Sequence, residues 1–217
     1  MASRQTHALS LEPEVLLAAY RAGIFPMEVA GAIRWFSPDP RGILPLGAFH
    51  LPHGLRRALK RGWRVTSDRR FEEVLAGCAA REETWIDERI RSAYLRLHQL
   101  GYAHSVEVLW EGELAGGLYG VALGGAFFGE SMFHRVTDAS KVALAALVAL
   151  LLERGFQLLD TQWTTPHLEQ FGAREIPRSR YLQMLRSALA VAPCWPEDVP
   201  VSGLPFGPEL RWPAGDR

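Results

Sequence analysis

The chain has 217 residues, 48% of them hydrophobic, and its 24 basic side chains balance 24 acidic ones. This composition indicates a soluble globular protein with one large domain or two small ones and an ample core. The longest apolar run, residues 142–152, excludes a membrane-spanning helix, which needs about 20 residues. The first residues lack the apolar core of a signal peptide, and the two cysteines fit no metal or disulfide spacing, so we expect a cytoplasmic protein without a membrane or metal partner.

The first forty residues predict a small separate unit. Residues 10–23 are expected to form a short helix, with Ser10 as its N-cap and Gly23 at its end. The proline-rich segment that follows is expected to be extended and turning, because proline and the residue before it disfavour helix. We therefore place a small N-terminal domain at 1–40 and the main domain at 41–217.

The rest of the chain alternates between helical and extended patterns. The predicted helices are 51–61, 71–80, 86–100 and 139–154, and the predicted strands are 63–67, 105–110, 113–121, 125–131 and 157–162. Helices, an antiparallel meander, and then a helix and a strand favour an α+β fold, a mixed sheet with helices packed on it. The tail at 193–213, rich in proline and glycine, is expected to wrap the surface.

Polar side chains interrupt two apolar segments in the second half of the chain. Glu130 stands within one predicted strand, and Asp160 and Gln162 end another. An unpaired polar group in apolar surroundings costs roughly 2–7 kcal/mol, so these groups should have partners or a ligand. If the two strands are neighbours, the three side chains can converge on one catalytic pocket. The alternative is a buried hydrogen-bonded network, paired with Arg135 or Lys141.

Apolar residues surround these polar groups. They fit an ordinary core, and they fit equally well a pocket for a bulky apolar side chain, polar at one end. The residues concerned are Phe127, Met132, Leu144, Leu147, Leu151 and Leu159.

Two other features of this region resemble catalytic motifs but are not predicted to be catalytic. Gly129-Glu130-Ser131-Met132-Phe133 begins like the nucleophile elbow of hydrolases, but Phe133 occupies the place of the final glycine, so Ser131 is not predicted to be a nucleophile. A lone histidine beside a strand end, His134, is expected to be structural.

A basic cluster lies in the segment 56–70, which carries seven basic residues and one acid. Its first part contributes Arg56, Arg57, Lys60, Arg61 and Arg64. Such a cluster can bind nucleic-acid phosphates, although the charges alone favour a solvated helix face. Trp85, just before a predicted helix, can stack on a base or serve as a packing anchor.

Longer motifs recur in a fixed order over about residues 15–185. They are AYRAGIFP (19–26), WFSPDPR (35–41), TWI (84–86), HSVEV (104–108), GGLYGV (116–121), FGESMF (128–133), ASK (139–141), DTQ (160–162) and GAREIPR (172–178). In these motifs and in their order, the chain resembles the leucyl/phenylalanyl-tRNA–protein transferases.

The resemblance implies an enzyme that moves Leu or Phe from its charged tRNA to a protein whose N-terminal residue is Arg or Lys, which marks that protein for degradation. It implies a fold similar to the GNAT acyltransferases, with a small N-terminal domain. No cofactor and no metal are implied, since the aminoacyl-tRNA is itself the activated substrate.

The resemblance also suggests roles for the residues singled out above. Asp160, acting with or through Gln162, would polarise or deprotonate the incoming amine, and Glu130 would position the amino groups. The apolar residues around them would receive the Leu or Phe side chain. Trp85, Met27 and Ser131 would contact the terminal adenosine of the tRNA, with Met27 standing where many relatives have tryptophan. The basic cluster then becomes a groove for the acceptor stem.

Two alternatives stay open. A GNAT-like N-acyltransferase that uses acyl-CoA is the runner-up, but residues 135–138, before the predicted helix, do not form the glycine-containing pyrophosphate loop of that class. A non-catalytic RNA-binding module would explain the basic cluster, but not two acids and an amide in apolar strands.

Overall fold

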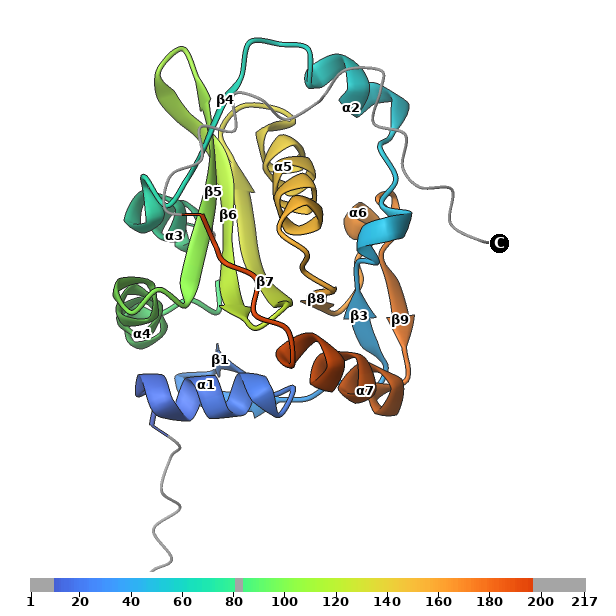
Figure 1. Ribbon diagram of the computed structural model, residues 1–217. Helices are drawn as coiled ribbons and strands as arrows, with labels where there is room; N and C mark the ends of the chain where they lie inside the picture. The colour runs from blue at the N-terminus through green and yellow to red at the C-terminus, as the bar shows by residue number, and fades with distance from the viewer. Residues whose placement is uncertain (1–9, 81–83, 197–217) are drawn as a thin grey trace, which may run out of the picture.

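A computed structural model describes residues 10–80 and 84–196, and a seven-stranded mixed sheet forms its centre (Figure 1). All neighbouring strands run antiparallel except β7 and β8, which are parallel. The strand order is β4 (Arg64–Ser67), β5 (Ala103–Trp110), β6 (Glu113–Leu123), β7 (Ala126–His134), β8 (Leu158–Gln162), β3 (Arg41–Ile43) and β9 (Arg174–Ile176). The α+β class predicted from the sequence is confirmed.

Helices cover both faces of the sheet, and each face has its own hydrophobic cluster. One face carries α1 (Pro13–Arg21), α3 (Phe71–Ala79), α4 (Glu88–Gln99) and α7 (Arg178–Leu189). The other carries α2 (His53–Ala58), the 3-10 helix η1 (Leu46–Ala48), α5 (Ala139–Glu153) and α6 (Pro166–Glu169), with α5 lying along the strands (Figure 1). Helix α5 is buried on nearly all sides because its sequence is apolar around the whole circumference.

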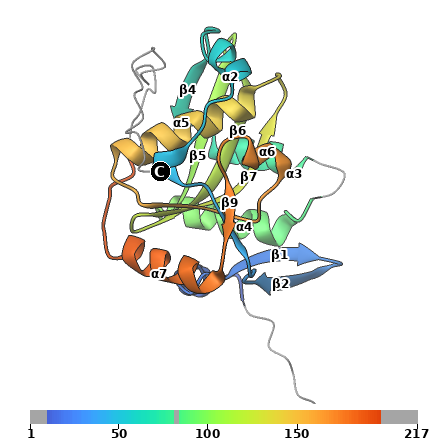
Figure 2. The same ribbon diagram turned by 90° about the vertical axis from the view of Figure 1, so that its right-hand side faces the viewer.

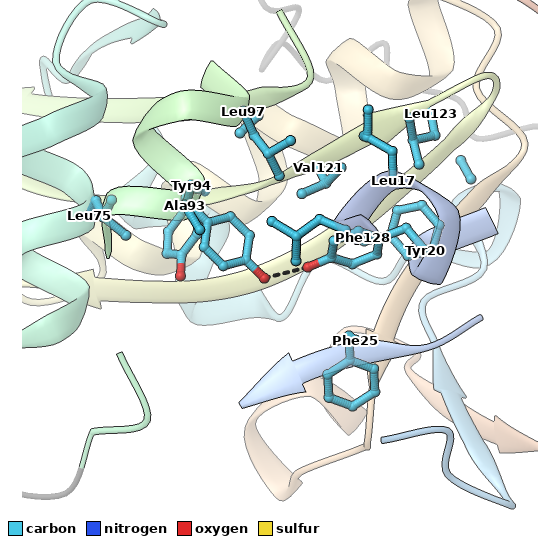
Figure 3. Close-up of a cluster of buried hydrophobic side chains, with 14 of the residues drawn as sticks. Leu17, Tyr20, Phe25, Leu75, Ala93, Tyr94, Leu97, Val121, Leu123 and Phe128 are labelled. Carbon is cyan, nitrogen blue, oxygen red and sulfur yellow. Dashed lines mark hydrogen bonds between the residues drawn. The ribbon is translucent and has the colours of Figure 1, made fainter. Parts of the chain in front are cut away.

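The N-terminal segment is packed into the first of these clusters. Helix α1 contributes Leu16, Leu17 and Tyr20, which share a core with α3 and α4 (Figure 3). An antiparallel hairpin of β1 (Phe25–Val29) and β2 (Ala32–Phe36) follows and extends from the body of the molecule (Figure 2). The backbone N–H of Glu28 donates to the carbonyl oxygen of Trp85 at 3.3 Å, which joins the hairpin to the segment before α4.

The predicted helices and strands are all present, with ends that differ by a few residues. The sequence did not predict the strands β3 and β9, the 3-10 helix η1 or the helices α6 and α7. Strands of three residues, such as β3 and β9, are too short to show a periodic pattern. Of the predicted surface tail, residues 197–213 lie outside the described residues. Its Trp195 packs inward instead, with its ring 4.3 Å from that of His104 and 5.4 Å from that of Phe127.

An irregularity in β7 determines where a site can form. In the pairing of β6 with β7, Tyr119 lies opposite Ser131 and Gly120 lies opposite Gly129, so Glu130 is the extra residue of a β-bulge. Strands β7 and β8 pair only over Ala126–Phe128 and Leu158–Asp160. Beyond that point β7 follows β6 and separates from β8.

Gly120 makes this bulge possible, because a Cβ atom there would lie 2.2 Å from the carbonyl oxygen of Phe128. We expect Gly120→Ala to lower the free energy of unfolding by about 1–3 kcal/mol, the usual cost of overpacking. Urea denaturation measures this loss. The control is Gly54→Ala in α2, where no atom lies within 4 Å of the added methyl group. Equal stability of the two variants would contradict the prediction.

Candidate active site

A cavity of about 120 Å³ opens where β7 and β8 separate. This volume far exceeds the roughly 10–15 Å³ that holds one water molecule, so the cavity is large enough for a small ligand group. Its walls come from β6, β7, β8, α5 and α6. The lining residues are Leu118, Tyr119, Gly129, Glu130, Ser131, Met132, Leu144, Leu147, Leu159, Thr161, Gln162 and Leu168. The lining is therefore mainly apolar, with a carboxylate and an amide among its polar groups.

Glu130 faces this cavity and is held by two tyrosines. Tyr20 donates to Oε1 at 2.8 Å and Tyr94 donates to Oε2 at 3.0 Å, and the two hydroxyl groups also contact each other (Figure 3). Burial, followed by the negative charge of Glu130, raises the pKa of both tyrosines, so their hydroxyls stay protonated and donate.

The pKa of Glu130 is raised to about 7, chiefly because burial disfavours its charged form. The hydrogen bonds from Tyr20 and Tyr94 oppose this rise, and the charge of Asp160 adds to it. The carboxyl group therefore changes its protonation state near neutral pH. A group of this kind in a cavity can accept a proton from a bound amine.

Asp160 lies in a different environment, fully buried beside Arg41. The guanidinium of Arg41 donates from Nε to Oδ1 at 2.9 Å and from Nη2 to Oδ2 at 2.6 Å. Tyr181 donates to Oδ2 at 2.7 Å, and the backbone N–H of Gln162 donates to Oδ1 at 2.9 Å. Arg41 also donates to the carbonyl oxygen of Gly23 at 2.9 Å. Its guanidinium group lies over the aromatic rings of Phe25 and Tyr181.

Two routes were predicted for Asp160, acting with Gln162 or through it. Its two oxygens already accept four hydrogen bonds and its side chain has no exposed surface, so the route through Gln162 fits this geometry. The partners expected for a buried network were wrong: Lys141 binds Asp138 at 2.8 Å, and Arg135 donates to the carbonyl oxygen of Leu114. The actual partner, Arg41, is 119 residues away, and no local pattern pairs the two.

Gln162 ends β8 with its side chain at the cavity wall. Its φ of 59° lies in the left-handed region, which is unfavourable for a residue with a side chain, and the N–H held by Asp160 fixes this conformation. Within the part of the chain that the structure describes, its side-chain Nε2 and the Oγ1 of Thr161 are buried and have no hydrogen-bond partner. Two such groups beside one cavity indicate a polar ligand atom there.

The structure brings together most of the residues predicted for the side-chain pocket. Met132, Leu144, Leu147 and Leu159 line the cavity, as does Ser131, which was assigned to the tRNA end of the site. Two of the predicted residues do not line it. Phe127 points into the core and stacks on Trp195, and Leu151 lies one turn of α5 beyond Leu147, with no exposed surface. Leu118 and Leu168 complete the wall and were missed.

The residues predicted to contact tRNA lie at the surface in two places. Met27 and Trp85 are half-buried and are brought together by the hydrogen bond between Glu28 and Trp85. The basic cluster lies in and after α2, and its five side chains are exposed: Arg56, Arg57, Lys60, Arg61 and Arg64. The guanidinium of Arg61 lies over the rings of Trp63 and Trp110, at 5.3 and 4.9 Å from their centroids.

The described ranges, 10–80 and 84–196, contain no helix long and apolar enough to span a membrane. They also contain no group of three or more His, Cys, Asp or Glu side chains that could hold a metal ion.

The fold and the site define a class of protein. A cavity with an apolar wall, next to a carboxyl group that titrates near pH 7 and an unpartnered amide N–H, suits an enzyme that transfers an apolar acyl group to an amine. Comparison with known proteins gives the family within this class. A family model for leucyl/phenylalanyl-tRNA protein transferase matches residues 43–186, and one for the N-terminal domain of the same family matches residues 10–39.

Curated relatives agree with this assignment. The chain is 56% identical to the leucyl/phenylalanyl-tRNA–protein transferase of Salinibacter ruber, over 85% of this chain and 83% of that relative. It is 52% identical to the enzyme of the same name from Rhodopseudomonas palustris strain HaA2, over 94% of this chain and 96% of that relative. The chain belongs to the leucyl/phenylalanyl-tRNA protein transferase family, a family of aminoacyltransferases.

Solved structures show more distant likenesses. One is L-PGS from Bacillus licheniformis, 14% identical with a TM-score of 0.42, over 69% of this chain and 50% of that chain. Another is a GCN5-related N-acetyltransferase from Kribbella flavida, 11% identical with a TM-score of 0.42, over 75% of this chain and 60% of that chain.

The buried ion pair predicts that Arg41 contributes much more to the free energy of unfolding than an exposed arginine does. We expect Arg41→Met to lower the free energy of unfolding by about 3–5 kcal/mol, because it leaves the Asp160 carboxylate buried without its counter-charge. Urea denaturation followed by circular dichroism measures the loss. The matched control is Arg186→Met on α7, an exposed position where a change within about 0.5 kcal/mol is expected. A small effect at Arg41 would show that Asp160 does not depend on this partner.

Proposed function

We propose that this protein transfers Leu or Phe from charged tRNA to the N-terminal Arg or Lys of acceptor proteins, in the cytoplasm and without a cofactor, and so marks them for degradation. The observation that carries the proposal is the cavity between β7 and β8, apolar along its wall and polar beside Glu130 and Gln162. A leucyl or phenylalanyl ester matches this cavity, because its apolar side chain is attached to a polar carbonyl group and a polar amine. The family to which the chain belongs supports the same activity.

In this proposal the apolar wall receives the side chain of the transferred amino acid. Met132, Leu144, Leu147 and Leu159 would surround it, together with Leu118 and Leu168. A pocket of this kind rejects polar side chains because their polar atoms would be buried without partners. The same pocket binds related apolar side chains with only modest discrimination.

Gln162 would act on the ester carbonyl. Its unpartnered Nε2 is available to donate to the carbonyl oxygen, on which negative charge develops as the amine attacks. Asp160 would act indirectly: it accepts a hydrogen bond from the backbone N–H of Gln162 and forms an ion pair with Arg41. It would therefore position the amide without receiving a proton.

Glu130 would take the proton of the acceptor amine. As the amine nitrogen forms the new amide bond with the carbonyl carbon, it loses a proton to the Glu130 carboxylate. The bond between the carbonyl carbon and the ribose oxygen breaks, and the ribose oxygen leaves with a proton as the free hydroxyl of the tRNA. The pKa of about 7 at Glu130 suits both the acceptance and the return of this proton.

The tRNA would extend from the cavity over two surface regions. Met27 and Trp85 would contact the terminal adenosine, and the exposed basic cluster around α2 would bind acceptor-stem phosphates. Ser131, which lies on the cavity wall, would also contact the adenosine. Phosphate contacts carry little sequence information, so tRNA binding should be salt-sensitive and largely independent of the stem sequence.

The decisive experiment is a transfer assay with radiolabelled Leu-tRNA or Phe-tRNA and a peptide that begins with Arg. Label in the peptide supports the proposal, and transfer to an otherwise identical peptide that begins with Glu would contradict the acceptor specificity. Absence of transfer at low salt would refute the activity. Transfer from an acyl-CoA in place of the charged tRNA would favour the other acyltransferase class.

The pH dependence of transfer tests the role of Glu130. A base acts in its deprotonated form, so kcat should rise as the pH increases through about 7, and Glu130→Gln should remove this rise. Tyr20→Phe should move the midpoint to higher pH, because the hydrogen bond from Tyr20 lowers the pKa of Glu130. A midpoint that does not change in Tyr20→Phe would assign the titration to another group.

The volume of the cavity should control the choice between Leu and Phe. Leu147→Phe places a larger side chain in the cavity wall and should raise the preference for Leu over Phe, as a ratio of kcat/KM values, by about 10-fold. The control is Leu152→Phe in the same helix, an exposed position that should leave the ratio unchanged. Equal effects of the two variants would mean that the cavity does not select the side chain.

A further inference from the structure

One exposed cation in the hairpin is used by neither the fold nor the proposed reaction. Arg34 lies in β2, directly opposite Met27 in the register with β1, and its side chain is exposed. Within the described residues it forms no ion pair and no side-chain hydrogen bond. Other charged side chains at the hairpin have partners: Glu28 accepts from the backbone N–H of Gly31, and Arg89 binds Asp87 and the carbonyl oxygen of Gly31.

The register places Arg34 on one face of the hairpin together with Met27. Residues directly opposite each other in an antiparallel pair share a face, and alternate residues of a strand share it too. Phe25 and Phe36 form the preceding pair on this face, with ring centroids 6.0 Å apart, and both contact the ring of Trp163.

This face of the hairpin begins near the cavity and extends away from it. Trp163 directly follows Gln162, so the Phe25–Phe36 pair lies at the cavity end of the hairpin. The pair of Met27 and Arg34 comes two residues further out, about 7 Å along the strand. An aminoacyl group in the cavity would be joined to its ribose near Gln162, and the nucleotide would then lie over this face.

We propose that Arg34 binds the phosphate of the 3′-terminal nucleotide of the tRNA. This inference rests on the proposed function, which places the terminal adenosine at Met27 and Trp85. The long guanidinium side chain beside Met27 can reach the phosphodiester that joins this nucleotide to the rest of the tRNA, and its planar fork of N–H donors matches phosphate oxygens. The contact would hold the nucleotide at the position where a methionine offers less stacking surface than an aromatic ring would.

The test compares two donors that differ in this phosphate. Leu-tRNA has the phosphodiester, and leucyl-adenosine lacks it. In Arg34→Gln the KM for Leu-tRNA should rise about 5-fold at 0.1 M salt and about 25-fold at 0.01 M, since one lost phosphate contact removes a slope of about 0.7 in log K against log salt. The KM for leucyl-adenosine should stay unchanged, and Arg34→Lys should recover most of the loss. Arg186→Gln, with an exposed arginine on α7, controls for the loss of net charge.

Several outcomes would overturn the inference. An unchanged KM for Leu-tRNA in Arg34→Gln would show that the arginine is only solvated, and equal rises for both donors would assign the contact to the base or the ribose. The dissociation constant for uncharged tRNA, measured by filter binding on the same variants, separates this inference from the proposed function. Wild-type protein that transfers nothing but binds tRNA through Arg34 would refute the reaction and keep the contact. If the wild-type protein transfers Leu and its tRNA binding does not depend on Arg34, the contact is refuted and the proposed reaction is kept.

Discussion

Arg41 and Asp160 are opposite charges that lie in contact with no exposed surface, and taking such a pair out of water costs several kcal/mol per ion. The pair is stable here because further hydrogen bonds occupy the remaining positions on both groups, from Tyr181, from the backbone of Gln162 and to the carbonyl oxygen of Gly23. These partners come from β3, β8, α7 and the turn after α1. One ion pair thus fixes the short strand β3 in the sheet and the end of β8 beside the cavity.

The separation of β7 from β8 is the second requirement of the site. Two strands that stay paired leave no space between them, whereas a bulge at Glu130 directs the rest of β7 away from β8. The space that results is lined by side chains that would otherwise be ordinary core, such as Leu144 and Leu159. The bulge also changes which side of the sheet each later residue of β7 faces, so that Phe127 and Met132, an odd number of residues apart, pack in the same cluster.

Asp160 and Glu130 lie in different surroundings. Asp160 accepts two hydrogen bonds from the guanidinium of Arg41, which ties it to the framework of the sheet. Within the described residues, Glu130 receives hydrogen bonds only from the neutral hydroxyl groups of Tyr20 and Tyr94, which compensate for burial incompletely and leave its pKa near 7. Tyr20 belongs to α1 and Tyr94 to α4. The N-terminal segment therefore influences the pKa of Glu130 through the hydrogen bond from Tyr20.

The sequence by itself determined a good deal about this protein. Apolar periodicity placed the long helices and strands, because these follow from local patterns of burial, and ordered motifs identified the family. The same patterns singled out Glu130 and Gln162, since polar groups within apolar strands require partners. Only the tertiary structure decided that Asp160 pairs with Arg41, that Tyr20 and Tyr94 hold Glu130, and that Phe127 and Leu151 belong to the core and not to the cavity. Those facts depend on contacts between residues far apart in the chain and on the register of one bulged strand, and neither of these leaves a periodic signal in the sequence.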